Sequence, residues 1–143
     1  MKQLGYTVNQ WLDLFEELKR NRETSYYFNT KILRGLTEIP WGALDPINSL
    51  DDIIRIIEAT LPGWAYKFGT CSVSDDAWIV PDFNCPIRGP LLLQQYGPIE
   101  AGSIWDTGID VDNRPSGNLS MTPCMAFCRA MAYSKGHKPN GQL

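Results

Sequence analysis

The chain has 143 residues, of which 43% are hydrophobic and 20% charged, a composition typical of one globular domain and not of a disordered chain. Its 16 acidic and 13 basic residues give a net charge of -3, which argues against a protein that binds nucleic acid by neutralising phosphates. The sequence contains no run of about 18 apolar residues and no leader segment. We therefore expect a cytoplasmic protein without a membrane span, whose four cysteines are thiols.

The first helix is predicted to begin at Thr7. Thr7 and Gln10 have the spacing of a capping box, in which each side chain bonds the backbone N–H of the other residue. The apolar residues that follow recur at helical intervals and form one face. This face consists of Trp11, Leu14, Phe15 and Leu18.

A second helix is predicted over residues 25–36, although the three aromatic residues near its start also suit a strand. Residues 39–47 contain two prolines and a glycine and predict a loop. We place a boundary at this loop. It separates an N-terminal helical arm (residues 1–47) from a main domain (residues 48–136).

The main domain begins with the clearest helix of the chain, which Ser49 caps and the Pro-Gly pair at 62–63 ends. From 64 to 68, aromatic residues alternate with other residues, which predicts a half-buried strand. The aspartates at 75–76 predict a turn. Residues 77–83 then return as the second strand of an antiparallel hairpin.

Residues 84–117 are rich in proline and glycine and predict a long irregular insert. The three leucines at 91–93 predict a short helical turn or a tucked loop inside this insert. A third strand is expected near residues 108–111.

The last helix is predicted to be capped by Thr122, with Pro123 at the first helical position, and to end at Gly136. We expect it to bury one stripe, composed of Cys124, Phe127, Cys128 and Met131. We expect residues 137–143 to form a frayed tail. Together the elements predict an α+β fold in which a small antiparallel sheet is layered against helices, with an added N-terminal helical arm.

Several residues occur in an order that resembles a known family over roughly residues 48–134. They are Ser49, Asp51, Leu61, Pro62, Gly63, Trp64, Thr122, Pro123, Cys124, Ala126 and Ala130. The chain is similar here to the phage ABA-sandwich family of small phage- or prophage-encoded proteins. The resemblance implies a helix–sheet–helix layering and a phage or prophage origin, and it implies no activity. The N-terminal arm lies outside it, and the insert is longer than the family leads us to expect.

The residues that commonly carry chemistry favour structural interpretations. Cys71, Cys85, Cys124 and Cys128 lack the close pairs of a zinc site, and the last two lie in an apolar stripe. His137, the only histidine, lies in the tail, where no rigid scaffold holds it as a catalytic base. The sequence therefore predicts a protein that is not an enzyme and that has no metal site and no cofactor.

Aromatic and acidic residues in and beside the insert are the candidate binding residues. Exposed tryptophan and tyrosine are enriched at the energetic centres of protein interfaces. The acidic residues of the insert lack the central glycine and the closing glutamate of a calcium loop. The candidates are Trp105, Tyr96, Trp78, Asp106, Asp110 and Asp112.

These observations predict an accessory protein of phage or prophage origin that acts in the host cytoplasm. We expect it to bind and block a host protein or protein complex. The more specific form of this prediction is an anti-defence inhibitor of the anti-CRISPR type. One alternative is a sponge or hydrolase for a nucleotide signal, with the base held against Trp105 or Tyr96. Another is a homo-oligomeric structural protein that pairs through a sheet edge or through the arm.

Overall fold

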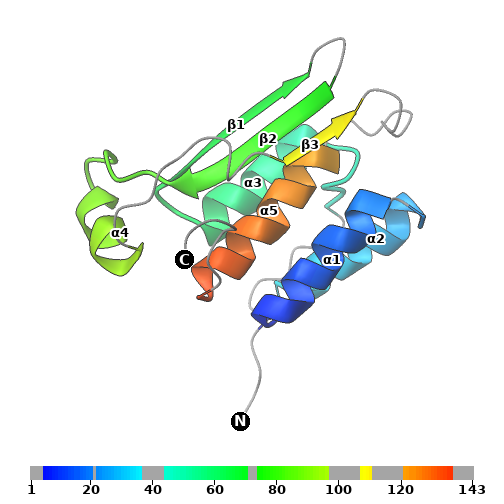
Figure 1. The fold of residues 1–143 in the computed structure, drawn as a ribbon, viewed down its shortest axis with the longest axis horizontal. Helices are drawn as coiled ribbons and strands as arrows, with labels where there is room; N and C mark the ends of the chain where they lie inside the picture. The colour runs from blue at the N-terminus through cyan, green and yellow to red at the C-terminus, as the bar shows by residue number, and fades with distance from the viewer. Residues whose placement is uncertain are drawn as a thin grey trace.

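The structure is a computed structural model that describes residues 5–20, 22–36, 44–70, 74–96, 107–110 and 121–136. Within these residues it contains five helices and three strands (Figure 1). The helices are α1 (Val8–Arg20), α2 (Ser25–Arg34), α3 (Leu50–Thr60), α4 (Gly89–Tyr96) and α5 (Met121–Ser134), and the strands are β1 (Trp64–Thr70), β2 (Ser74–Pro81) and β3 (Thr107–Asp110). The predicted α+β class is confirmed, since an antiparallel sheet packs against α5.

Side-chain caps begin α1, α2 and α3. The predicted capping box is formed, because the Thr7 N–H donates to Gln10 Oε1 at 2.9 Å and the Gln10 N–H donates to Thr7 Oγ1 at 3.2 Å. The predicted cap of α3 is also formed, since the Asp52 N–H donates to Ser49 Oγ at 3.2 Å. Thr24 caps α2 in the same way. The aromatic residues at the start of α2 are therefore in a helix and not in a strand.

The three strands form one sheet in the order β1-β2-β3, with both pairs antiparallel. The predicted hairpin is confirmed, but Asp75 and Asp76 do not form its turn. They belong to β2 and pair with Thr70 and Gly69 of β1. The turn propensity of aspartate is a local preference, whereas the register is set along the whole strand by the residues that it buries. The connection consists of residues 71–73, which lie outside the described residues.

The two faces of the sheet differ in what they contact. Ile79 of β2 is 1% exposed and pairs with Tyr66 of β1, whose hydroxyl donates to Glu58 of α3 at 2.8 Å. This face packs on the helices. Trp78 alternates with Ile79 and pairs with Lys67, so it lies on the opposite face, where it is partly buried.

α5 is the central helix of the molecule. Twelve of its fourteen residues are buried, because it lies between the sheet and α1 and also contacts α3 (Figure 1). The four residues predicted to be buried are buried, but they are not a single stripe, since a helix enclosed by other elements is apolar all round. The prediction that Thr122 caps this helix is wrong. α5 begins at Met121, and the hydroxyl of Thr122 is buried in its first turn without a hydrogen-bond partner among the described residues.

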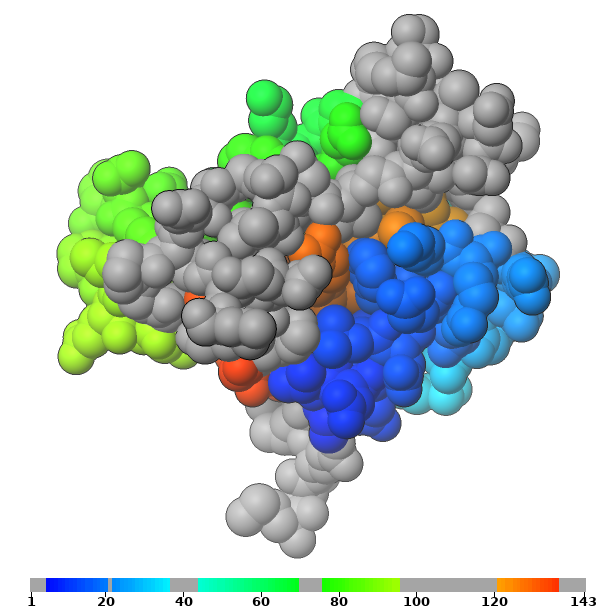
Figure 2. All heavy atoms as spheres, in the orientation of Figure 1, coloured from blue at the N-terminus to red at the C-terminus, as the bar shows by residue number. Residues whose placement is uncertain are grey.

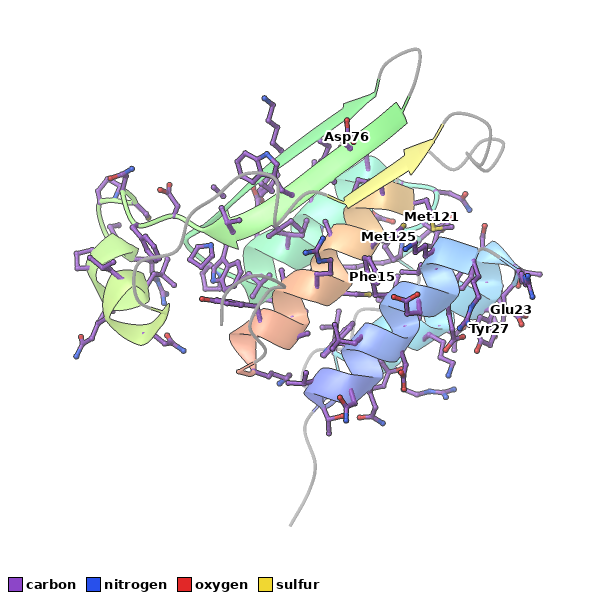
Figure 3. The ribbon with its side chains drawn as sticks, viewed as in Figure 1. Phe15, Glu23, Tyr27, Asp76, Met121 and Met125 are labelled. Atoms are coloured by element: carbon purple, nitrogen blue, oxygen red, sulfur yellow. The ribbon has the colours of Figure 1, made fainter. Side chains whose placement is uncertain are left out.

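α1 packs directly on α5 and shares its core. The ring of Trp11 is fully buried and meets the ring of Phe127 edge-on, with 5.6 Å between the ring centroids. Phe15 is partly buried on the side of α1 that faces α5 (Figure 3), and the guanidinium of Arg129 lies 5.8 Å from its ring centroid. The N-terminal arm and the main layer therefore bury their apolar side chains in one common core.

Hydrogen bonds attach the segment before α3 to both parts of the chain. Asn29 of α2 donates from Nδ2 to Asp45 Oδ1 at 2.5 Å and accepts from the Ile47 N–H at 3.0 Å. The thiol of Cys124 in α5 donates to the carbonyl of Pro46 at 3.3 Å. The described end of the predicted boundary loop is thus fixed to α2 on one side and to α5 on the other.

Candidate functional site

The helix α4 lies at one end of the molecule, beyond the layer formed by α1, α2, α3 and α5 (Figure 1). In Figure 2 its yellow-green atoms form the left edge of the surface. The leucines at 91–93, for which a helical turn or a loop is predicted, are part of this helix of eight residues. The predicted insert therefore contains a regular helix as well as the strand β3, which lies close to the predicted third strand.

A close backbone approach anchors α4 to the rest of the fold. Gly63 has φ +87°, and a Cβ placed there would lie 2.6 Å from Arg88 Cβ and 3.2 Å from Leu92 Cδ1. Only glycine accommodates both this backbone conformation and this contact. The carbonyl of Gly63 also accepts a hydrogen bond from the Asp82 N–H at 3.2 Å. Leu92 is 7% exposed and is the buried anchor of the helix.

Apolar side chains on α4 and on the turn before it are exposed. Ile87 is 82% exposed, Leu91 62% and Leu93 46%. Backbone hydrogen bonds from Gly89 to Cys85 and from Leu92 to Arg88 give the preceding turn the spacing of a helix. Ile87 and Leu91 are therefore one helical turn apart and lie on the same side. We call the three residues Ile87, Leu91 and Leu93 the α4 surface.

The α4 surface has residues on both sides of the buried anchor. Neighbouring residues in a helix are about 100° apart around its axis, so Leu91 and Leu93 flank Leu92 on opposite sides. A helix with apolar side chains on several sides is typical of a buried position. In this structure only one of the three leucines is buried. The exposed leucines are thus a surface that another molecule can cover.

The predicted binding residues are distributed over several parts of the chain. Trp105, Asp106 and Asp112 lie outside the described residues. Tyr96 is the last residue of α4. Asp110 ends β3 and pairs with Ser74 of β2, and Trp78 lies in β2 on the face away from α5. Their role in binding stays a prediction.

The thiols of α5 are unsuited to nucleophilic chemistry. Burial raises the pKa of the Cys128 thiol far above its usual value. Burial also raises the pKa of Cys124, with a smaller contribution from its neighbour Cys128. Because the thiolate is the reactive form, both residues are inert at neutral pH. This confirms the prediction that these two cysteines pack in the core.

Metal-binding side chains do not converge in the described part of the chain, where no group of three or more histidine, cysteine, aspartate or glutamate residues is close enough to hold an ion. Cys85 is partly exposed in the turn before α4, separate from the buried thiols of α5. Cys71 lies outside the described residues.

The residues of the α4 surface are absent from the sequence-based candidates, although a signal for them exists. Three consecutive leucines in a helix cannot all face one core, because they point in directions about 100° apart. If the segment is helical, at least one of them must be exposed or covered by a further layer. The sequence does not decide between helix and loop for this segment, and the signal depends on that choice.

No known protein family, curated protein or solved structure matches this chain. The resemblance to the phage ABA-sandwich family therefore stays an expectation from the sequence. No helix among the described residues is long and apolar enough to cross a lipid bilayer. The place of the protein in the host cytoplasm also stays a prediction.

Proposed function

We propose that this protein is a non-enzymatic binding protein that inserts α4 into an apolar groove of another protein. The observation that supports this most directly is the position of the exposed apolar residues. The described residues expose five large hydrophobic side chains, and three of them lie within residues 87–93. Scattered single exposures are normal, but a local group of large apolar side chains is typical of an interaction site.

The shape of the α4 surface favours a groove over a flat partner. Leu91 and Leu93 lie on opposite sides of the helix, so a flat partner can cover only one of them. A groove covers both, as in complexes in which a short amphipathic helix is bound along its length. α4 itself, with the sequence GPLLLQQY, carries no charged residue. A groove that accepts it must therefore be apolar where it contacts the leucines.

The size of the α4 surface argues against a second copy of this chain as the partner. Three aliphatic side chains form a patch within the few hundred Å² of the largest apolar patch of an ordinary monomer. Two such convex patches in contact bury much less than the roughly 1,200–2,000 Å² of a stable interface. A concave partner can reach that area because its walls also contact the residues around these three side chains.

We further propose, from the resemblance, that the protein is encoded by a phage or prophage and that its partner is a host protein or protein complex. A defence complex is the specific version of this proposal. The acidic net charge and the inert thiols of α5 agree with a protein that acts by covering a surface. The nucleotide-sponge alternative depends on Trp105 and Tyr96, whose side chains the structure does not describe.

The test is a double variant, Ile87→Lys with Leu91→Lys, compared with the wild type in affinity capture from the natural host. Lysine at two exposed positions leaves the fold intact but cannot be buried in an apolar groove without a large desolvation cost. We expect a stoichiometric partner of the wild type to be lost, with at least about tenfold weaker binding to the purified partner.

The matched control is Tyr26→Lys, because Tyr26 is 79% exposed on α2 and is remote from α4. We expect this variant to capture the same partner as the wild type. Equal capture by all three proteins would contradict the proposal. Sedimentation at two concentrations gives a separate test of the homo-oligomer alternative, for which the sedimentation coefficient rises with concentration.

A further inference from the structure

A small cleft lined by both polar and apolar side chains lies beside the start of α1 and the last turns of α2, away from the α4 surface. Its volume is about 220 Å³. The residues that line it are Tyr6, Gln10, Asp13, Leu14, Lys31 and Arg34. None of them is among the residues predicted from the sequence to bind a ligand. The cleft is therefore independent of the proposed function.

The wall formed by Tyr6 is held in place by the surrounding fold. Its hydroxyl donates to the carbonyl of Lys31 at 2.6 Å, and its ring meets that of Trp11 edge-on with 4.9 Å between centroids. Gly35 makes this packing possible, because a Cβ at Gly35 would lie 2.6 Å from Tyr6 Cδ2. The Tyr6 side chain is therefore held by a hydrogen bond at its hydroxyl and by packing against Trp11. This wall of the cleft is thus formed before any ligand binds.

Hydrogen-bond donors dominate the lining. Lys31 and Arg34 are three residues apart on α2, so one group can contact both of them. The Lys31 ammonium lies 5.5 Å from the centroid of the Tyr27 ring, a contact that uses none of its N–H donors. Gln10 Oε1 already accepts from the Thr7 N–H, which leaves the amide NH₂ as a donor.

Asp13 is the single acidic residue of the lining, against two basic ones. Among the described residues it forms no ion pair with Lys31 or Arg34. Burial raises the pKa of Tyr6. The positive charge of Arg34 has a smaller, opposite effect on that pKa, which indicates that Arg34 lies near the Tyr6 hydroxyl. The cleft therefore offers two positive groups for an anion and one carboxylate that can accept a hydrogen bond.

We propose that this cleft binds a small hydroxylated phosphomonoester, with the phosphate between Lys31 and Arg34 and a ligand hydroxyl donating to Asp13. The guanidinium fork and the ammonium group are the usual donors to phosphate in proteins. Tyr6 and Leu14 supply the apolar part of the lining, against which the carbon atoms of the ligand would lie. The volume is smaller than the roughly 300–1,000 Å³ of pockets for drug-sized ligands, so the ligand is about the size of a pentose phosphate.

The experiment is a titration of the purified full chain with ribose 5-phosphate, inorganic phosphate and ribose, followed by NMR of the backbone amides. We expect ribose 5-phosphate to shift the amides of Gln10, Lys31 and Arg34, and to bind more tightly than phosphate, with ribose inert. Arg34→Gln is expected to weaken ribose 5-phosphate binding about tenfold. Asp13→Asn is expected to remove the advantage of ribose 5-phosphate over phosphate.

Arg55→Gln is the matched control, because Arg55 is an exposed arginine on α3 that does not line the cleft. Equal weakening by Arg34→Gln and Arg55→Gln would show a non-specific charge effect and overturn the proposal. No shift at millimolar ribose 5-phosphate would overturn it as well. The α4 variant with lysine at 87 and 91 must bind ribose 5-phosphate like the wild type, which separates this test from that of the proposed function.

Discussion

At the scale of single residues, Thr122 shows how sequence and structure diverge. A threonine followed by proline is a common helix start, yet Thr122 lies inside the first turn of α5 with a buried hydroxyl. A buried hydroxyl without a partner has lost its hydrogen bonds to water and gained none in the protein. At this position the hydroxyl group therefore opposes folding instead of supporting it.

We predict that Thr122→Val raises the free energy of unfolding by about 1 kcal/mol, because valine has nearly the same shape and no polar group to desolvate. Thr24→Val is the comparison, since Thr24 is a true cap whose Oγ1 accepts from the Tyr27 N–H at 3.1 Å. That change should lower the free energy of unfolding by about 1 kcal/mol. Urea denaturation followed by circular dichroism measures both values. A loss of stability in Thr122→Val would mean that the hydroxyl has a bonding role.

At the scale of elements, the position of α4 depends on contacts between distant parts of the chain. The turn after α3 touches the turn before α4 at Gly63, and Leu92 fills the space beside it. These contacts hold the helix while its flanks stay exposed. The backbone that carries the α4 surface is therefore fixed on the fold, which reduces the entropy that is lost when a partner binds.

We predict that Gly63→Ala destabilises the fold by about 1–3 kcal/mol, since alanine is strained at a positive φ and its Cβ overlaps the side chain of Arg88. Gly69→Ala is the matched control, because a Cβ at Gly69 meets no atom within 4 Å. That change in a strand should be neutral or slightly stabilising. Thermal unfolding of the two variants measures the difference. Equal melting temperatures would contradict the proposed anchoring of α4.

At the scale of the whole molecule, the N-terminal arm and the sheet share α5 as their common support. α1 covers one side of α5 and the sheet covers another (Figure 1). α2 is joined to α1 by the Tyr27 hydroxyl, which donates to Glu17 Oε1 at 2.6 Å. Figure 3 shows Tyr27 on α2, on the far side of α1 from the sheet. We therefore expect a change at Tyr27 to affect the unfolding of the entire chain.

Because of the Tyr27 hydroxyl, the stability of the fold is expected to change with pH in the alkaline range. The hydrogen bond to Glu17, and secondarily burial, raises the pKa of Tyr27 from 10.0 to about 12. Below pH 10 the tyrosine is neutral in both the folded and the unfolded chain, so its full contribution to stability is present. Between these two pKa values the unfolded chain loses the proton first, and the contribution falls as pH rises.

We predict that Tyr27→Phe lowers the urea midpoint at neutral pH. The difference in midpoint between the variant and the wild type should be smaller at a pH midway between the unfolded and folded pKa values of Tyr27. The pKa of Tyr66 is also raised, mainly by its hydrogen bond to Glu58, so some alkaline destabilisation persists in the variant. Circular dichroism reports the helices and tryptophan fluorescence reports the core. Midpoints that differ between the two probes would mean that the arm unfolds separately from the sheet.

Much of the fold was predictable because its signals are local. The capping pairs Thr7–Gln10 and Ser49–Asp52, the hairpin of β1 and β2 and the apolar face of α1 depend on residues close together in the sequence. The candidate site was less predictable. Exposure of Leu91 and Leu93 depends on where distant residues such as Gly63 lie, and the cleft beside Tyr6 joins side chains from two helices.

The sequence by itself determined the class of fold and the order of its main helices and hairpin. It could do so because periodicity, capping and hydrophobicity act over short stretches of chain. Only the tertiary structure decided that α5 is enclosed on several sides, that α1 shares its core and that α4 keeps its flanks exposed. Burial is a property of the neighbours that an element acquires on folding, and those neighbours come from far along the chain.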